Sequence, residues 1–272
     1  MLCLPKTKPR QWVGDGKQPR HGENPVKRLC AALGFLTVIP LPGACLPTER
    51  DLTGSVAFFP LVGLLIGLSA AVVCMALENV FPPMVLAVLL TGWLSMVHGG
   101  LHLDGLADTA DGFFSHHGRE RVLAIMRDSH IGAFGCLAIG GILALKVAAI
   151  ASLPDGYLMK AIFLSPVMGR AIMVPMLDFL PPARTDGLGS LFYRDRSIRQ
   201  SVAESMAAMV ISLTAAWLLL GFAGLLAGAV VVLAMALFVH WCWRRIGGIT
   251  GDTMGTASEI SEALVLLVLC TQ

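Results

Sequence analysis

The sequence predicts an all-α protein, a polytopic helical bundle embedded in a membrane. Hydrophobic residues make up 56% of the 272 residues and charged residues only 14%, whereas soluble domains carry about 25% charged residues. The hydrophobic residues gather in runs long enough to cross a bilayer, which takes about 20 apolar residues per helix. With a net charge of only +2, this composition excludes a disordered chain and a basic nucleic-acid-binding protein.

Four apolar runs of spanning length come first along the chain. Prolines mark two of their boundaries, with Pro82 and Pro83 before the second run and Pro181 and Pro182 after the fourth. Because backbone polar groups inside a bilayer must be satisfied within the chain, we expect each run to form one helix. The predicted spans are residues 55–77, 84–102, 131–152 and 160–180.

The remaining runs bring the predicted total to about seven transmembrane helices. Residues 205–239 are too many for one crossing and just enough for two, so we expect Gly221 and Gly224 to form a turn between two helices. The last run, residues 263–270, is short, and we expect it to extend back to Thr253 as one helix with a polar start.

The N-terminal part of the chain differs in character. Residues 1–26 are polar and basic and lack the apolar segment of a secretory signal peptide. We interpret them as a mobile cytoplasmic leader, and residues 27–272 as a single transmembrane catalytic domain. The apolar piece at 29–41 is interrupted by Pro40 and Pro42, and we interpret it as interfacial or re-entrant.

The cationic residues predict an orientation in the membrane. Of the 20 Lys and Arg residues, 17 fall before the first span or in the loops after the second, fourth and sixth. With seven spans, all these segments lie on one side of the bilayer. The positive-inside rule then places the N-terminus and these loops in the cytoplasm.

Acidic residues stand at the cytoplasmic ends of two predicted helices. Asp104, Asp108 and Asp111 fall within about 60° of one another at about 100° per residue, so they form one stripe. Asp252, Glu259 and Glu262 form a second stripe about 80° wide. Carboxylates on one face suit Mg²⁺ or Mn²⁺, and we expect both stripes to face one polar cavity.

Two histidines precede the first acidic stripe. His98 and His102 have the i, i+4 spacing of a zinc pair, but no HExxH motif follows and Asp104 is poorly placed as a third ligand. We prefer polar lining of the acidic site, or proton transfer by one of the two.

Several basic or glycine-containing segments are candidates for substrate phosphate. Lys146 and Arg170 lie inside predicted spans, where a cation needs a partner, so each forms a buried salt bridge or binds phosphate. We expect Arg127 to bind a substrate phosphate. Asp128 beside it either caps the third span or faces the substrate. The loop that contains Gly187 and Gly189 is also basic and is a weaker candidate.

These features together predict transfer chemistry on a diphosphate. A divalent metal would neutralise the bridging and leaving oxygens, while Arg and Lys hold the remaining charge. The chain carries no Walker A, GxSxG or protein-kinase motif.

The same motifs resemble those of the cobalamin synthase family, the adenosylcobinamide-GDP ribazoletransferases. The central resemblance is the run HGGLHLDGLADTADGFFS followed by IMRDSHIGAFG. The segments FLTVIPLP, FFPLVGLLIG, SPVMGRA, GLGSLF and GGITGDTMGTASEISE are also similar, in the same order. The resemblance covers about residues 30–270. Thr256 stands where that family more often has a small apolar residue, and the leader is longer.

The resemblance implies an activity, a cofactor and a location. Adenosylcobinamide-GDP and α-ribazole, or its 5′-phosphate, would give adenosylcobalamin, or its 5′-phosphate, and GMP, with Mg²⁺ required. The enzyme would lie in the bacterial inner membrane with its site facing the cytoplasm. On this hypothesis Asp104, Asp108, Asp111 and Asp252 hold Mg²⁺. Glu259 and Glu262 complete the site, with one acid of the second stripe acting as general base, while Arg127 and Arg170 bind phosphate and His98 or His102 relays the proton.

Two alternatives remain at this point. A CDP-alcohol phosphotransferase would have Ala-Arg where this chain has Ala107-Asp108. An ion-coupled transporter would use acids near the midplane and show an inverted repeat, which is not visible. The sequence leaves open the lower base, the general base and the oligomeric state, a homo-oligomer included.

Overall fold

The computed structural model describes residues 24–42, 45, 48–184, 192–193 and 198–272. Nearly all of the predicted leader lies outside the described residues, as do Gly187 and Gly189. Within the described ranges every regular element is helical, apart from one isolated parallel bridge between Pro182 and Ile249. The prediction of an all-α fold is confirmed.

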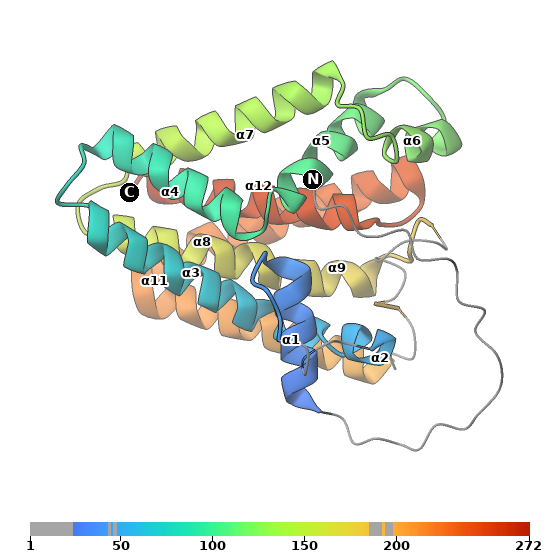
Figure 1. Ribbon diagram of the computed structural model, residues 1–272, viewed down its shortest axis with the longest axis horizontal. Helices are drawn as coiled ribbons and strands as arrows, with labels where there is room; N and C mark the ends of the chain where they lie inside the picture. Colours follow the sequence, from blue (N-terminus) through green and yellow to red (C-terminus); the bar gives the residue numbers. More distant parts are fainter. Residues whose placement is uncertain (1–23, 43–44, 46–47, 185–191, 194–197) are drawn as a thin grey trace.

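Long helices lie side by side and form a bundle (Figure 1). Shorter helices lie across the bundle or at one end of it. The long helices are α3 (Phe59–Leu77), α4 (Pro83–Val97), α7 (Ala133–Ala151), α8 (Leu158–Ala171), α11 (Ile198–Ile246) and α12 (Gly251–Leu269). The others are α1 (Pro25–Leu36), α2 (Glu49–Thr53), η2 (Val56–Phe58), α6 (Arg119–Ile125), α9 (Met173–Phe179) and α5 (Leu101–Phe114), which equals α8 in length.

Several helices are long and apolar enough to cross a membrane, as an integral membrane protein requires. In the described part of the chain these are Val56–Leu77, Ala133–Ala151, Leu158–Phe179 and Arg199–Ile246. The pair α4 and α5 is a fifth candidate if the two count as one broken span. Length and composition therefore support four or five candidate spans, where the sequence predicted about seven.

The difference arises partly from α11, which contains both spans predicted in residues 205–239. Gly221 interrupts its helical backbone with φ 57° and ψ −132°. A Cβ at Gly228 would meet the side chain of Leu213, and one at Gly224 would meet the backbone of Ala216. Residues on the two sides of Gly221 therefore lie against each other, and the predicted turn is confirmed. Gly224 belongs to the second arm and permits its close approach to the first.

The second predicted span, residues 84–102, is wrong at its C-terminal end. Helix α4 ends at Val97, and α5 leaves it at an angle of 88°. Gly99 and Gly100 have φ of 61° and 76°, the left-handed region that glycine adopts without steric cost. The chain therefore bends at residues 98–100, with His98 at the end of α4 and His102 at the start of α5.

Helix α12 is the centre of the bundle. It contacts α5, α7, α8, α9 and α11, and most of its residues are buried. A reciprocal capping box between Thr250 and Thr253 fixes its start. The prediction that the last apolar run extends back into a polar helix is confirmed.

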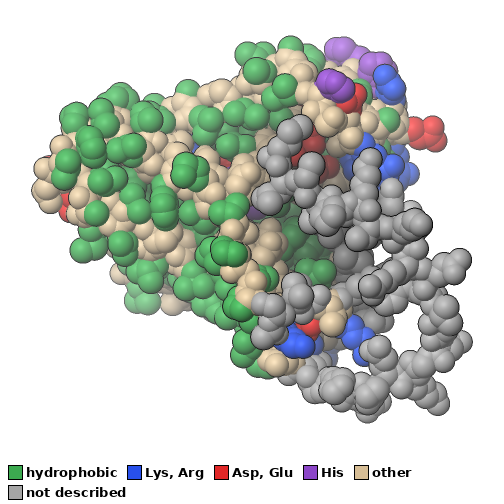
Figure 2. All heavy atoms as spheres, in the orientation of Figure 1, with side chains coloured by type: hydrophobic (Ala, Val, Ile, Leu, Met, Phe, Trp, Pro, Cys, Tyr) green, Lys and Arg blue, Asp and Glu red, His purple; other side chains and the backbone are tan. Residues whose placement is uncertain are grey.

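Charged side chains gather at one end of the molecule. Figure 2 shows hydrophobic side chains over most of the visible face, with most Lys, Arg, Asp, Glu and His side chains near α2 and α6. Hydrogen bonds join the segments there: Arg119 donates to the carbonyl of Ala183 (3.3 Å), and Arg245 donates to the carbonyl of Ser115 (2.6 Å).

Candidate active site

An acidic cluster forms where α5 crosses the first turn of α12. Asp104 is exposed, and Asp108, Asp111 and Asp252 are half-buried. Asp108 interacts electrostatically with the three other carboxylates. We call these four residues the acidic cluster. Two helices thus bring together residues about 150 positions apart in the chain, and the cluster presents only oxygen ligands.

Small residues allow α5 and α12 to come this close. A Cβ at Gly105 would lie 2.8 Å from the Cα of Asp252, so alanine there would force the helices apart. The hydroxyl of Thr256 lies 2.9 Å from that of Thr109 and 3.1 Å from the carbonyl oxygen of Gly105. Thr256, where the sequence departs from the family pattern, therefore adds a polar contact between these two helices.

Asp111 also has a structural task. Its two carboxylate oxygens accept hydrogen bonds from the backbone N–H of Gly132 (2.7 Å) and of Gly135 (2.9 Å). These N–H groups belong to the start of α7, where a helix has no internal acceptors. Asp111 therefore caps α7 from α5, a task that the sequence interpretation considered for Asp128.

Asp128 lies instead in an exposed turn between α6 and α7. It accepts hydrogen bonds from the backbone N–H of His130 (3.1 Å) and from the ring Nδ1 of His130 (2.6 Å). The side-chain bond, followed by the backbone bond, lowers the pKa of Asp128. The same pair raises the pKa of His130. Arg127 is the exposed neighbour of this turn.

Arg184 brings a cation to the acidic cluster. Its Nη2 lies 3.5 Å from Oδ2 of Asp252, at a partly exposed position. The sequence interpretation placed Arg184 in the basic loop before Gly187 but did not select it. Its position after Pro181 and Pro182, at the end of a predicted span, was the only signal available.

A second, fully buried cluster lies farther along α12. Lys146 of α7 donates to Glu259 (2.7 Å) and to Glu262 (2.6 Å), and Arg170 of α8 pairs with Glu262. All four side chains are at most 1% exposed. Two cations face two carboxylates, so this ion-pair cluster is electrically balanced. Of the alternatives for Lys146 and Arg170, these contacts show the salt bridge.

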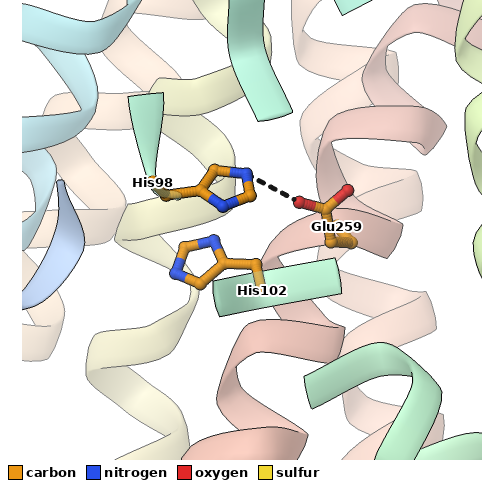
Figure 3. A group of neighbouring side chains, drawn as sticks. All are labelled: His98, His102 and Glu259. Atoms are coloured by element: carbon orange, nitrogen blue, oxygen red, sulfur yellow. Dashed lines mark ion pairs between the residues drawn. The ribbon is translucent and has the colours of Figure 1, made fainter. Parts of the chain in front are cut away.

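The two histidines adjoin the ion-pair cluster. His98 ends α4 and His102 begins α5, and their rings stack with centroids 4.5 Å apart. Nε2 of His98 lies 3.2 Å from Oε1 of Glu259. Figure 3 shows both rings beside the carboxylate of Glu259 on α12.

Comparison with known proteins decides the family. The family described as cobalamin-5-phosphate synthase matches residues 28–270. The chain belongs to this family. The resemblance seen in the motifs is confirmed over the whole length that it was expected to cover.

Cobalamin-5-phosphate synthases with curated names resemble the chain over most of their length. The "Adenosylcobinamide-GDP ribazoletransferase" of Roseiflexus sp. is 39% identical over 93% of this chain and 92% of its own. Proteins with the same name from Geotalea daltonii and Acetivibrio thermocellus are 40% and 36% identical, over 88% and 89% of this chain and 94% and 97% of theirs. No solved structure matches the chain.

The structure divides the predicted second stripe. Asp252 joins Asp104, Asp108 and Asp111, whereas Glu259 and Glu262 contact Lys146 and Arg170. Asp252 and Glu259 share a helix face but lie roughly 10 Å apart along the axis. The expectation of a single cavity lined by both stripes is therefore replaced by two clusters on one helix.

Proposed function

We propose that the acidic cluster is the reaction centre and that the ion-pair cluster holds α12 in position beside it. Membership of the family and the consistent names of the relatives make the chain an enzyme of cobalamin biosynthesis, an adenosylcobinamide-GDP ribazoletransferase. The observation that carries the assignment of the site is the meeting of four carboxylates from α5 and α12 at the charged end of the bundle.

The reaction is a displacement at phosphorus. A ribose hydroxyl oxygen of α-ribazole, or of its 5′-phosphate, attacks the phosphorus bonded to cobinamide. The bond from this phosphorus to the bridging oxygen breaks, and GMP leaves with that oxygen. The hydroxyl proton passes to a carboxylate, and the product is adenosylcobalamin or its 5′-phosphate.

The acidic cluster fits Mg²⁺, which takes oxygen ligands and is held in proteins by carboxylates together with substrate phosphates. Asp104, Asp108 and Asp252 are the residues that would hold it, and Asp111 contributes from its capping position. When bound, Mg²⁺ would stabilise negative charge on the diphosphate and on the departing GMP. By holding the ion, the carboxylates would set the position of the diphosphate relative to the attacking hydroxyl.

Arg184 and Arg127 are the cations that we assign to substrate phosphate. Both lie in connecting segments at the charged end of the bundle, where phosphates can reach them, and neither belongs to the buried cluster. Lys146 and Arg170 instead keep Glu259 and Glu262 compensated, so their effect on the reaction passes through α12. Asp128 positions the turn that carries Arg127 through its bonds to His130.

We infer that the protein lies in the inner membrane of a bacterium and that its site faces the cytoplasm. Arg119, Arg184 and Arg245 lie at the same end of the bundle as the acidic cluster, and the positive-inside rule assigns such segments to the cytoplasmic side. Lipid would cover the apolar faces of the long helices. Labelling of single cysteines at this end in intact cells and in inverted vesicles tests the orientation.

The proposed function is tested by turnover of purified protein in liposomes. Adenosylcobinamide-GDP, α-ribazole and Mg²⁺ are supplied, and GMP and cobalamin are separated by chromatography. We expect equal amounts of both products from wild type and from Glu120→Gln, a matched exposed acid on α6. We expect Asp108→Asn to lose activity at least 100-fold, about 2.7 kcal/mol of transition-state stabilisation.

Full activity in a folded Asp108→Asn protein would remove the acidic cluster from the reaction. If wild type moves a solute across the liposome membrane and forms no GMP, the protein is a transporter and not this enzyme. A phosphotransferase of the CDP-alcohol type would turn over a CDP-alcohol but not adenosylcobinamide-GDP.

A further inference from the structure

His98, His102 and Glu259 form a compact group that the proposed chemistry does not use. One potential ligand atom from each residue lies within 4.8 Å of the two others. The exposed fractions of the three residues are 3%, 2% and 0%. We call these three residues the histidine–glutamate group.

The fold holds this group in place from three elements. The bend at Gly99 and Gly100 stacks the two rings, although α4 and α5 run nearly at right angles. A Cβ at Gly255 would lie 3.0 Å from the Cα of His102, so glycine lets α12 approach closely. The group is thus built by the packing of α4, α5 and α12.

The polar atoms of this group are not satisfied by hydrogen bonds. Among the described residues, neither ring nitrogen of His98 or of His102 has an aligned hydrogen-bond partner, and Oε1 of Glu259 has none. A buried polar atom left in this state costs about 1–3 kcal/mol. One potential ligand atom of each residue lies within 4.8 Å of the two others, and this convergence points to a ligand that all three side chains share.

The spacing of these atoms is also that of two ligands on one metal ion. Nε2 of His98 and Oε1 of Glu259 are 3.2 Å apart, yet the ring N–H is not aligned with the oxygen. Ligand atoms about 2.0–2.2 Å from a tetrahedral zinc ion lie roughly 3.3 Å from each other. This pair therefore already has the separation of two zinc ligands, and a ring nitrogen of His102 lies within 4.8 Å of both atoms.

The charges around the group bear on how it could bind a metal ion. Lys146 and Arg170 lie beside the group, and each is paired with a carboxylate of α12. Oε2 of Glu259 accepts a hydrogen bond from Lys146, and Oε1 faces Nε2 of His98. The hydrogen bond from Lys146 would therefore hold the carboxylate of Glu259 in place while its other oxygen binds the metal. Because the neighbouring ion pairs are balanced, a divalent ion would add two positive charges, and an anionic fourth ligand such as hydroxide would offset one of them.

We propose that His98, His102 and Glu259 bind one divalent transition-metal ion, zinc in the first instance, at a site distinct from the acidic cluster. Two imidazoles and one carboxylate select borderline metals such as Zn²⁺, whereas Mg²⁺ prefers oxygen ligands. Three protein ligands leave a fourth position open, as in zinc sites that bind water or substrate.

The experiment measures bound metal directly. Purified protein in detergent is stripped with a chelator, loaded with ZnCl₂ and desalted, and zinc is measured by mass spectrometry. We expect one zinc per chain in wild type and in His130→Gln, a control at an exposed histidine. We expect no retained zinc in His98→Gln or His102→Gln. Loading with Co²⁺ should give the visible bands of tetrahedral cobalt in wild type only.

A thermal measurement keeps the test valid if a variant is less stable. Zinc should raise the melting temperature of stripped wild type, because it binds only the folded state, and should leave stripped His102→Gln unchanged. Zinc retained by both glutamine variants, or no zinc in wild type, would overturn the proposal. Asp108→Asn separates the two sites, since it should lose turnover but keep its zinc.

Discussion

Replacing Lys146 by methionine tests the role of the ion-pair cluster. The substitution keeps the length of the side chain but removes the cation that lies 2.7 Å from Glu259 and 2.6 Å from Glu262. Arg170 then faces two buried carboxylates alone, and one negative charge is uncompensated. Breaking a buried ion pair by removing one partner costs about 3–5 kcal/mol.

This cost corresponds to a measurable loss of thermal stability. At about 2–4 °C per kcal/mol for chains of this size, Lys146→Met should lower the melting temperature by roughly 6–20 °C. Tryptophan fluorescence of the detergent-solubilised protein measures it. Lys160→Met is the matched control, because Lys160 is exposed on α8 and should change the melting temperature little.

A compensating variant separates charge from packing. Adding Glu259→Gln to Lys146→Met leaves Arg170 opposite Glu262, so charge balance returns and much of the lost stability should return with it. If Lys146→Met melts like wild type, the buried charge is not compensated by Lys146 in the way that the structure shows. If the double variant is no more stable than Lys146→Met, packing and not charge explains the loss.

Three further predictions concern the surroundings of the acidic cluster. Gly105→Ala should reduce turnover at least 10-fold and raise the Mg²⁺ concentration needed, because the new Cβ meets the backbone of α12. Gly118→Ala is the control: its Cβ would meet nothing within 4 Å, so turnover in the same assay should not change. Asp111→Asn should leave one N–H at the start of α7 without an acceptor, at a cost of about 1–3 kcal/mol. Amide hydrogen exchange at the start of α7 should then become faster. Unchanged exchange would contradict the role of Asp111 as a cap. The hydrogen bond to Asp128 raises the pKa of His130, so the ring should stay protonated to a higher pH than a free histidine. Asp128→Asn should return its NMR titration toward the ordinary value, and identical titrations would refute the pair.

The sequence contains a substantial part of the fold. Bilayer chemistry allows few backbone conformations, so apolar runs of spanning length predict helices directly. The expected runs at 131–152 and 160–180 correspond to Ala133–Ala151 and Leu158–Phe179. Gly221 was expected to end one arm of the 205–239 run, and its left-handed backbone does so. The motif order also indicated the family before any fold was known.

The bend at residues 98–100 shows where local pattern was insufficient. Two consecutive glycines inside an apolar run are compatible with a continuous helix, a kink or a break. The break is favoured because it lets α5 pack along α12, with Gly105 against Asp252. Such a gain depends on a partner about 150 residues away, which the run itself does not contain.

The residue types of the candidate site were determined by the sequence, because acids and cations are too costly in an apolar chain to be placed without partners. Which partners they have was decided only by the tertiary structure. A helical wheel shows that Asp252 and Glu259 share a face, but roughly 10 Å of helix separates them. Asp252 therefore meets the carboxylates of α5, and Glu259 meets Lys146 and His98. Periodicity gives the direction of a side chain, and packing alone gives its neighbour.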